Sequence, residues 1–270
     1  MITAFREIIT DNIRYFSRVI RVAWLFFKKK NATSDLGWVW NVIKPVMYML
    51  MFYAGISLGF KNSKNIDGTV CPYFIWLISG MVAWFYISDH IAGGPNCYKT
   101  NKTLVTKGRY PVTVIPTVAV INNLYLHVIL VGVVLCLAML FGVKPSIYWL
   151  QIPVLTCMIM IFIYLWSFLF GMLTIVSADT LNLIKSIKPA FFWLSGILFN
   201  SRARDSIVFK LNPITYLVEG YRSSIAYNMC FWYSWKTTAC FFGELLIMAV
   251  ISAVLYKRLK YKLVETLVGV

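Results

Sequence analysis

Long apolar runs dominate this 270-residue chain and restrict what it can fold into. Of its residues, 60% are hydrophobic and only 13% are charged, whereas soluble domains carry about a quarter charged residues. A globular core cannot absorb that excess, but a bilayer core about 30 Å thick needs roughly 20 apolar residues for each helical crossing. Because several runs reach this length, the sequence predicts an all-α membrane protein.

Six of these runs are expected to cross the membrane as helices. An even number of crossings places both termini on one side. Lys and Arg are more frequent in the segments that would then lie in the cytoplasm, as is usual for cytoplasmic loops. The sequence therefore predicts cytoplasmic termini and spans at residues 38–60, 72–92, 112–141, 150–176, 182–200 and 237–256.

The segment before the first span is amphipathic. Its apolar side chains recur every three or four residues, while Arg14, Arg18 and Arg21 form a separate basic stripe. This pattern is typical of a helix that lies in the membrane plane, although an ordinary surface helix has the same periodicity. Gly37 then allows the backbone to turn into the first span. We expect one transmembrane domain over residues 1–270, divided into the interface helix and turn at 1–37, the bundle at 38–256 and a cytoplasmic tail at 257–270.

The formal net charge of +16 raises the alternative of a nucleic-acid-binding protein. Such proteins gather their basic residues into one patch or stripe. Here Lys and Arg fall between the apolar runs, which is how membrane proteins distribute charge beside anionic lipid. We therefore expect membrane lipid, and no nucleic acid, as the partner of these basic segments.

Residues 201–236, between spans five and six, do not have the composition of a solvated loop. They are rich in aromatic and aliphatic residues, which predicts an extracellular helical hairpin that re-enters the outer leaflet. Asn212 and Pro213 suit the N-cap and first position of its second helix. An amphipathic surface helix is the alternative. Glu219 and Arg222 can pair on one helical face, either to hold an outer gate closed or to fix two helices together.

Residues that could carry enzyme chemistry are sparse. The six cysteines show no CxxC pair and no metal-ligand spacing, so no metal site is expected. Only Cys71 and Cys230 could meet on the outer face. The two histidines are far apart in the sequence, and His127 is expected to form a hydrogen bond between helices. An integral membrane transferase, which needs converging acid and base groups, is therefore the weakest alternative.

Three motifs resemble those of one transporter family. The stretch LGWVWNVIKP begins at Leu36, NKTLVTKGRYPVTVIP begins at Asn101, and NPITYLVEGYRSSI begins at Asn212. Their order, spacing and flanking spans are similar to those of the ABC-2 type polysaccharide export permeases, which include the teichoic acid translocation and O-antigen branches. The resemblance extends along nearly the whole chain.

This resemblance implies a homodimer of six-span subunits in a bacterial plasma membrane. It also implies a separate ABC ATPase, in two copies, on the cytoplasmic face, and a lipid-linked polysaccharide of the undecaprenyl-diphosphate type as substrate. The chain has no GxxxxGK[ST] loop to hold nucleotide phosphates. We therefore expect ATP and Mg²⁺ in the partner ATPase and no cofactor in this chain. The alternative within the family is an ABC-2 permease that exports a small lipid or a drug.

The resemblance also implies roles for individual residues. The alternatives are an interfacial aromatic belt for the tryptophans, a generic basic loop for the coupling residues, and structural packing for the others. Cations near the inner end of the first span would lower the cost of bringing a diphosphate headgroup into hydrocarbon. The residues expected at this headgroup site are Arg14, Arg18, Arg21, Leu36, Gly37, Trp38 and Lys44. Those expected to line the channel are Trp40, Tyr48, Phe52, Phe191, Phe192 and Trp193. Coupling to the ATPase is expected through Tyr98, Lys99, Asn101, Lys102, Lys107 and Arg109. The outer gate would comprise Asn212, Pro213, Tyr216, Glu219 and Arg222.

Overall fold

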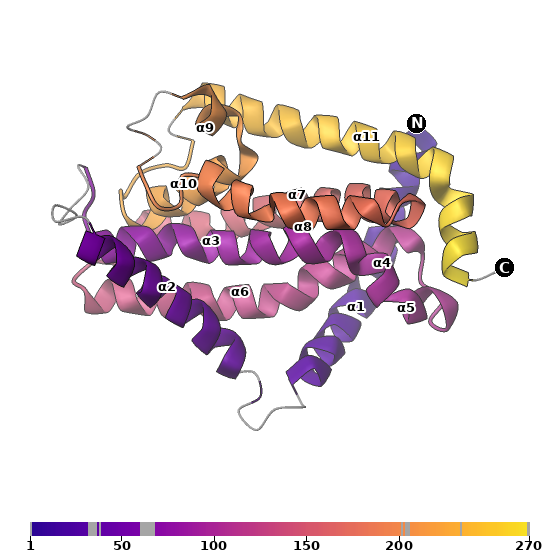
Figure 1. Ribbon diagram of the computed structural model, residues 1–270, viewed down its shortest axis with the longest axis horizontal. Helices are drawn as coiled ribbons and strands as arrows, with labels where there is room; N and C mark the ends of the chain where they lie inside the picture. Colours follow the sequence, from indigo (N-terminus) through magenta and orange to yellow (C-terminus); the bar gives the residue numbers. More distant parts are fainter. Residues whose placement is uncertain are drawn as a thin grey trace.

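The computed structural model describes residues 2–31, 37, 39–59, 68–200, 202, 206–232 and 234–268. In these ranges every regular element is a helix, and no strand occurs. Most of the longer helices run side by side along the long axis of the molecule (Figure 1). The all-α class predicted from the sequence is therefore confirmed.

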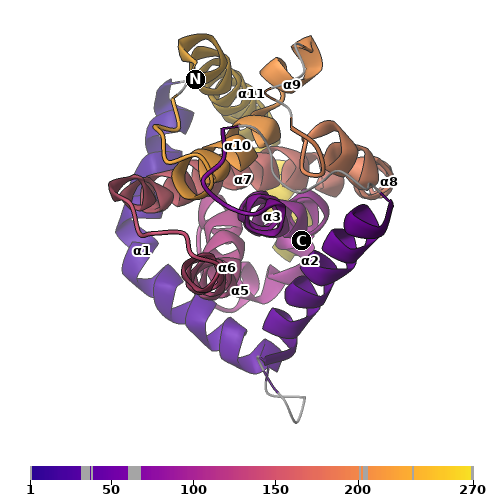
Figure 2. The ribbon, with the colours of Figure 1, turned by 90° about the vertical axis from the view of Figure 1, so that its left-hand side faces the viewer.

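Helix α3 (Tyr73–Gly93) forms the centre of the bundle. It packs against α6 (Ile115–Leu140), α7 (Gln151–Val176) and α8 (Asp179–Leu194), and nearly all of its side chains are buried. Figure 2, which looks along the bundle, shows α3 enclosed by its neighbours. A helix that is buried all round needs no polar face, which explains why its sequence is almost uniformly apolar.

Four described helices are long and apolar enough to cross a membrane. They correspond to the predicted spans two, three, four and six. The predicted first and fifth spans, which are α2 (Val39–Gly59) and α8, are not among these four. Helix α8 has 16 residues and ends at Leu194, before the predicted end at residue 200. It is therefore about 24 Å long at 1.5 Å per residue, which is shorter than a bilayer core of about 30 Å.

Two short helices lie between α8 and the last helix, as the composition of this segment predicts. They are α9 (Ile207–Leu211) and α10 (Pro213–Ile225). Every side chain of α10 from Ile214 onward is buried, and α10 packs against α3, α7 and α11 (Trp235–Val268). The alternative of a surface helix is therefore wrong for α10.

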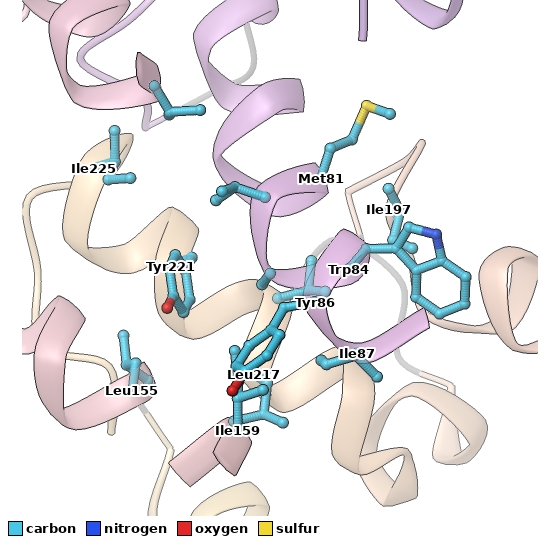
Figure 3. Close-up of a cluster of buried hydrophobic side chains, with 14 of the residues drawn as sticks. Met81, Trp84, Tyr86, Ile87, Leu155, Ile159, Ile197, Leu217, Tyr221 and Ile225 are labelled. Carbon is cyan, nitrogen blue, oxygen red and sulfur yellow. The ribbon is translucent and has the colours of Figure 1, made fainter. Parts of the chain in front are cut away.

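Helix α10 shares its buried surface with the helices around it. Figure 3 shows Leu217 and Tyr221 of α10 in the same apolar cluster as Tyr86 of α3 and Ile159 of α7. Each of these side chains is at most 3% exposed. Burying one such side chain contributes about 1.5–3 kcal/mol, so α10 is an integral part of the bundle core.

Both ends of the chain lie at the end of the bundle that carries α4 (Cys97–Thr100) and α5 (Lys102–Thr106), and α9 and α10 lie toward the opposite end (Figure 1). Helix α11 continues through most of the predicted tail, as far as Val268. Leu263 and Leu267 of this extension are buried in an apolar cluster, and α11 packs against both α1 and α5. Residues 257–268 are therefore a packed helix and not a free tail.

The amphipathic N-terminal segment forms helix α1 (Ile2–Asn31), which lies across the bundle against α6 and α11 (Figure 1). Polar contacts fasten it there. Asn12 Nδ2 donates to the Tyr164 hydroxyl of α7 at 3.1 Å. Glu7 forms an ion pair with Lys260 of α11, with 2.5 Å between Oε1 and Nζ. These contacts fix the orientation of α1 about its own axis.

Three faces of α1 have three different environments. One face packs on the bundle through Ile8, Val19 and Ala23. A second face exposes a row of large apolar side chains, namely Phe5, Ile9, Ile13, Phe16 and Ile20. The exposed side chains of Arg14, Arg18 and Arg21 lie about 150° from this row at 3.6 residues per turn. A helix with one bundle face, one exposed apolar face and one basic face fits the predicted position in the membrane plane.

Candidate functional site

A pocket of about 410 Å³ opens between α2, α3, α6 and α8. Its wall combines charged, amide and aromatic side chains. Four residues that the sequence analysis assigned to the substrate line it, namely Lys44, Tyr48, Phe52 and Phe192. The fold thus places one predicted headgroup cation beside three predicted channel residues from two distant parts of the sequence.

Aromatic rings form one side of this pocket. The ring centroid of Phe192 in α8 lies 5.2 Å from that of Phe52 in α2 and 5.5 Å from that of Trp84 in α3. Ring pairs at such separations contribute about 0.5–1.5 kcal/mol beyond the area that they bury. These contacts hold α2 and α8 against α3 and leave apolar ring surface on the pocket wall.

Charged and amide groups form another part of the wall. Lys44 of α2, Lys188 of α8, Asp89 of α3 and Asn123 of α6 all line the pocket. Lys44 and Asp89 are exposed, and Lys188 is half-buried. Within the described ranges, none of these three charged groups forms an ion pair or a hydrogen bond. The pocket therefore carries two positive charges and one negative charge that a ligand can reach.

A second pocket of about 420 Å³ lies between α3, α4 and α6. It shares Asp89 and Asn123 with the first pocket, and Asn96, Thr100 and Asn122 add further polar groups to its wall. Because α4 lies at the end of the bundle that holds the chain termini (Figure 1), the two pockets together follow the contact between α3 and α6 from that end into the bundle.

The remaining predicted channel residues lie outside the first pocket. Phe191 packs on Trp166 of α7, with 5.6 Å between the ring centroids, while Trp40 and Trp193 are exposed. Successive residues of a helix point about 100° apart. Phe191, Phe192 and Trp193 therefore face three directions, and only Phe192 lines the pocket.

The predicted headgroup residues are not gathered at one place. Lys44 lines the pocket, but α1 contributes no residue to it, because α1 packs against α6 and α11 on another side of the bundle. Arg14, Arg18 and Arg21 lie exposed on the basic face of α1. Their grouping with Lys44 is therefore not seen. Gly37 has a φ of 52°, as a turn residue can, and Leu36 and Trp38 lie outside the described residues.

Two charged side chains of α10 form a cluster with one charged side chain from outside the helix. Glu219 and Arg222 pair as their spacing predicts, with 2.7 Å between Oε1 and Nη1, and both side chains are 0% exposed. The other carboxylate oxygen of Glu219 lies 2.7 Å from Nε of Arg202. The sequence analysis missed Arg202, because this residue is 17 positions from Glu219 in the sequence and does not share a helical face with it. One carboxylate thus lies between two guanidinium groups.

The guanidinium of Arg222 is enclosed on several sides. Its carbon lies 3.5 Å from the ring centroid of Trp76 in α3, and its Nη1 donates to the backbone carbonyl of Gly196 at 2.9 Å. A Cβ at Gly80 of α3 would lie only 2.8 Å from its Nε. Hydrogen bonds and close packing therefore fix α10 to α3 and to the turn after α8.

The start of α10 is also held as predicted. The Asn212 side chain caps the helix by accepting from the Ile214 amide at 2.9 Å, and Pro213 occupies the first turn. Tyr216 stacks on Phe241 of α11, with 4.8 Å between the ring centroids. All five predicted gate residues thus lie in or directly before α10, and this helix contacts both α3 and α11.

One hydrogen-bonded link joins the pocket to α10. His127 of α6 lines the pocket, and its Nε2 lies 2.8 Å from the hydroxyl of Tyr221 in α10. The same hydroxyl lies 2.7 Å from Oγ1 of Thr156 in α7. The prediction that His127 forms a hydrogen bond between helices is confirmed, and Tyr221 connects three helices.

The predicted coupling residues divide into two groups. Lys99, Lys102, Lys107 and Arg109 are exposed near α4 and α5. Tyr98 and Asn101 are at most 9% exposed, because Tyr98 packs against α7 at Gly171 and Asn101 donates to the Cys97 carbonyl. Their prediction as part of a docking surface was therefore wrong, and the four basic residues remain as the exposed group.

No group of three or more His, Cys, Asp and Glu residues in the described part of the chain is placed to hold a metal ion. All six cysteines are free, so Cys71 and Cys230 do not pair. Burial raises the pKa of the Cys71 thiol to about 12.

Comparison with curated proteins gives three relatives that match most of the chain. No family model matches it. The O-antigen export system permease protein RfbA of Myxococcus xanthus is 23% identical over 222 residues, which cover 80% of this chain and 83% of the relative. Two proteins of the same name from Klebsiella pneumoniae are 22% and 21% identical over 244 residues, which cover 89% of this chain and 91% of each relative. The resemblance to the polysaccharide export permeases, seen first in three motifs, is therefore confirmed over most of the chain.

Proposed function

We propose that this chain is the membrane-spanning permease subunit of an ABC exporter, which moves a lipid-linked cell-surface polysaccharide from the cytoplasmic to the outer face of the membrane. The observation that carries the proposal is the match of three O-antigen export permeases to 80–89% of the chain. Their names favour the O-antigen branch over the teichoic acid branch of the family.

The pocket supports this function by its chemistry. A lipid diphosphate carries concentrated negative charge, and hydrocarbon excludes it unless cations or water face it. Lys44 supplies a cation inside the bundle, and the rings of Tyr48, Phe52 and Phe192 supply apolar faces on which the C–H surfaces of sugars can pack. Such a wall holds a charged headgroup and a sugar chain without closing around either.

We also propose the topology of a six-span subunit with both termini in the cytoplasm, in which α2 and α8 complete the set of crossings and two copies form the conduit. Cysteine accessibility tests this topology. Glu265→Cys, near the end of α11, should react only with reagents that reach the cytoplasm. Lys144→Cys, in the loop after α6, should react from outside. Labelling of both positions from the same side would rule out the proposed orientation.

A separate ABC ATPase, in two copies, is proposed to dock on the exposed basic residues near α4 and α5. The double charge reversal Lys107→Glu with Arg109→Glu should lower ATP-driven export at least tenfold while the permease still folds and inserts. Lys236→Glu, an exposed lysine at the start of α11, is the matched control and should export normally. Normal export by the double variant would remove these residues from the coupling surface.

Deletion and complementation in the source bacterium test the proposed function as a whole. Loss of the gene should abolish a surface polysaccharide, and the wild-type gene should restore it. The permease purified together with its ATPase should carry a lipid-linked glycan that mass spectrometry identifies. An unchanged surface glycan together with altered drug sensitivity would instead favour the export of a drug or small lipid.

A further inference from the structure

Two lysines reach the same pocket from different helices. Lys44 belongs to α2 and Lys188 to α8. Helix α2 is largely apolar after Lys44, and α8 is apolar from Pro189 to its end at Leu194. Lys188 stands well inside α8, because the helix already begins at Asp179. The sequence analysis assigned no role to Lys188, so this juxtaposition is visible only in the fold.

The arrangement is unfavourable without an anion. Like charges that face one pocket repel each other, and a cation among apolar helices is costly unless it faces an anion, water or protein dipoles. No described residue pairs with either lysine. Among the described residues that line the wall, Asp89 carries the only carboxylate, and it balances one of the two positive charges.

We propose that this pocket is a phosphate-binding subsite of the permease, in which Lys44 and Lys188 hold the anionic phosphate group and the Asn123 amide donates to it. The assignment of this phosphate to a transported lipid rests on the proposed function. A phosphate or diphosphate presents acceptor oxygens on several sides, so two ammonium groups from separate helices can bind it together. The volume of about 410 Å³ is within the range of small-molecule sites.

The aromatic side of the pocket favours a phosphate that is attached to an organic group. Phe52, Trp84 and Phe192 form one continuous set of ring contacts on the wall. A free inorganic anion gains nothing from apolar ring surface, whereas a prenyl chain or a sugar does. The subsite therefore suits the headgroup region of a lipid phosphate.

Asp89 should lower the affinity of the subsite for phosphate. Its carboxylate repels an anion in the pocket, and it lies where the first pocket meets the second. A site on a transport path has to bind its cargo weakly enough to release it. Asp89 should therefore lower the residence time of the phosphate, and its removal should have the opposite effect to removal of a lysine.

Binding measurements on the purified 270-residue chain in lipid nanodiscs test the proposal without any transport step. Farnesyl diphosphate, farnesol and inorganic pyrophosphate are titrated separately into wild type, Lys188→Gln and the control Lys185→Gln, an exposed lysine of the same helix that does not line the pocket. Farnesyl diphosphate should bind wild type more tightly than farnesol does. Lys188→Gln should weaken its binding at least about tenfold, as expected for loss of a charge-assisted hydrogen bond.

A second variant, Asp89→Asn, should bind farnesyl diphosphate about threefold more tightly than wild type. A folding defect would weaken binding, so it cannot produce this result. If farnesyl diphosphate binds more tightly than pyrophosphate, the ligand is a lipid headgroup; if both bind equally and depend on Lys188, the subsite takes a free phosphate anion. Equal binding by wild type and Lys188→Gln would overturn the proposal. Loss of polysaccharide export in cells is measured separately, so the proposed function can fail while the binding result stands.

Discussion

Two sets of charges inside this bundle differ in how they are neutralised. Around α10, Glu219 lies between Arg222 and Arg202 at 2.7 Å from each, and the side chains of Glu219 and Arg222 are 0% exposed. In the pocket, Lys44 and Lys188 are accessible and have no ion-pair partner among the described residues. The charged side chains at α10 are thus paired and buried, whereas the lysines of the pocket are unpaired and accessible to a ligand.

The difference separates structural charges from charges that remain available to a ligand. A buried charge whose partner is removed retains its desolvation penalty, so a closed cluster is tightly coupled to stability. When an accessible charge without a partner is neutralised, the free energy of unfolding changes little. We therefore expect substitutions around α10 to act on folding and substitutions in the pocket to act on binding.

The largest effect is expected from Glu219→Gln. This change leaves the guanidinium groups of Arg202 and Arg222 without their shared carboxylate, and removing one member of a buried ion pair costs about 3–5 kcal/mol. The free energy of unfolding, measured by detergent-induced or thermal unfolding of the purified chain, should fall by this amount.

Glu265→Gln is the matched control for this prediction. Glu265 is an exposed residue of α11, and its neutralisation should change the free energy of unfolding by less than about 0.5 kcal/mol. If both variants unfold alike, the cluster around α10 does not hold the bundle together, and the contrast with the pocket disappears.

The next effect is steric and tests how closely Arg222 is enclosed. In Gly80→Ala the new Cβ would lie 2.8 Å from Nε of Arg222, and overpacking of this kind costs about 1–3 kcal/mol. Gly132→Ala in α6 is the control, because nothing lies within 4 Å of its Cβ. That substitution should be neutral or stabilise the chain by up to about 1 kcal/mol through helix propensity. Equal thermal unfolding of the two variants would show that Arg222 has room to move.

The cap at the start of α10 and the ion pair within this helix were predictable, because both depend on residues that are close in the sequence. An Asn-Pro pair caps a helix through the next few backbone groups, and the structure shows this cap at Asn212. Glu219 and Arg222 share a face through helical geometry alone. Arg202 contacts Glu219 although the two residues are 17 positions apart in the sequence. No local rule gives that contact, so the third charge was missed.

The pocket was less predictable because it depends on how four helices are rotated against one another. The sequence analysis assigned Lys44 to a headgroup site, and the fold places it in a pocket with other polar groups. It gave no means to choose among Phe191, Phe192 and Trp193, which point in different directions. It also assigned no role to Lys188, which the fold brings to the same pocket wall as Lys44. Sequence patterns leave helix boundaries uncertain by about two to four residues, so they do not fix which side chains of α8 reach the wall.

A smaller effect on the free energy of unfolding is expected at the hydrogen-bonded link between the pocket and α10. Tyr221→Phe removes the hydroxyl that bonds both His127 and Thr156, and the loss of such hydrogen bonds costs about 1–2 kcal/mol. Thr237→Val, whose hydroxyl bonds only a nearby carbonyl at the start of α11, is the control and should cost less. If Tyr221→Phe also weakens export when the protein is fully folded, the pocket and α10 are coupled in function.

The smallest effect on stability is expected from Lys44→Gln. Lys44 is exposed in the pocket and pairs with no described residue, so the free energy of unfolding should change by less than about 0.5 kcal/mol. Export measured with the partner ATPase should nevertheless fall, because the headgroup loses a cation on its path. Separate measurements of unfolding and export on one preparation distinguish these outcomes. A stability loss as large as that of Glu219→Gln would mean that Lys44 has a structural partner after all, and the two sets of charges would no longer differ in kind.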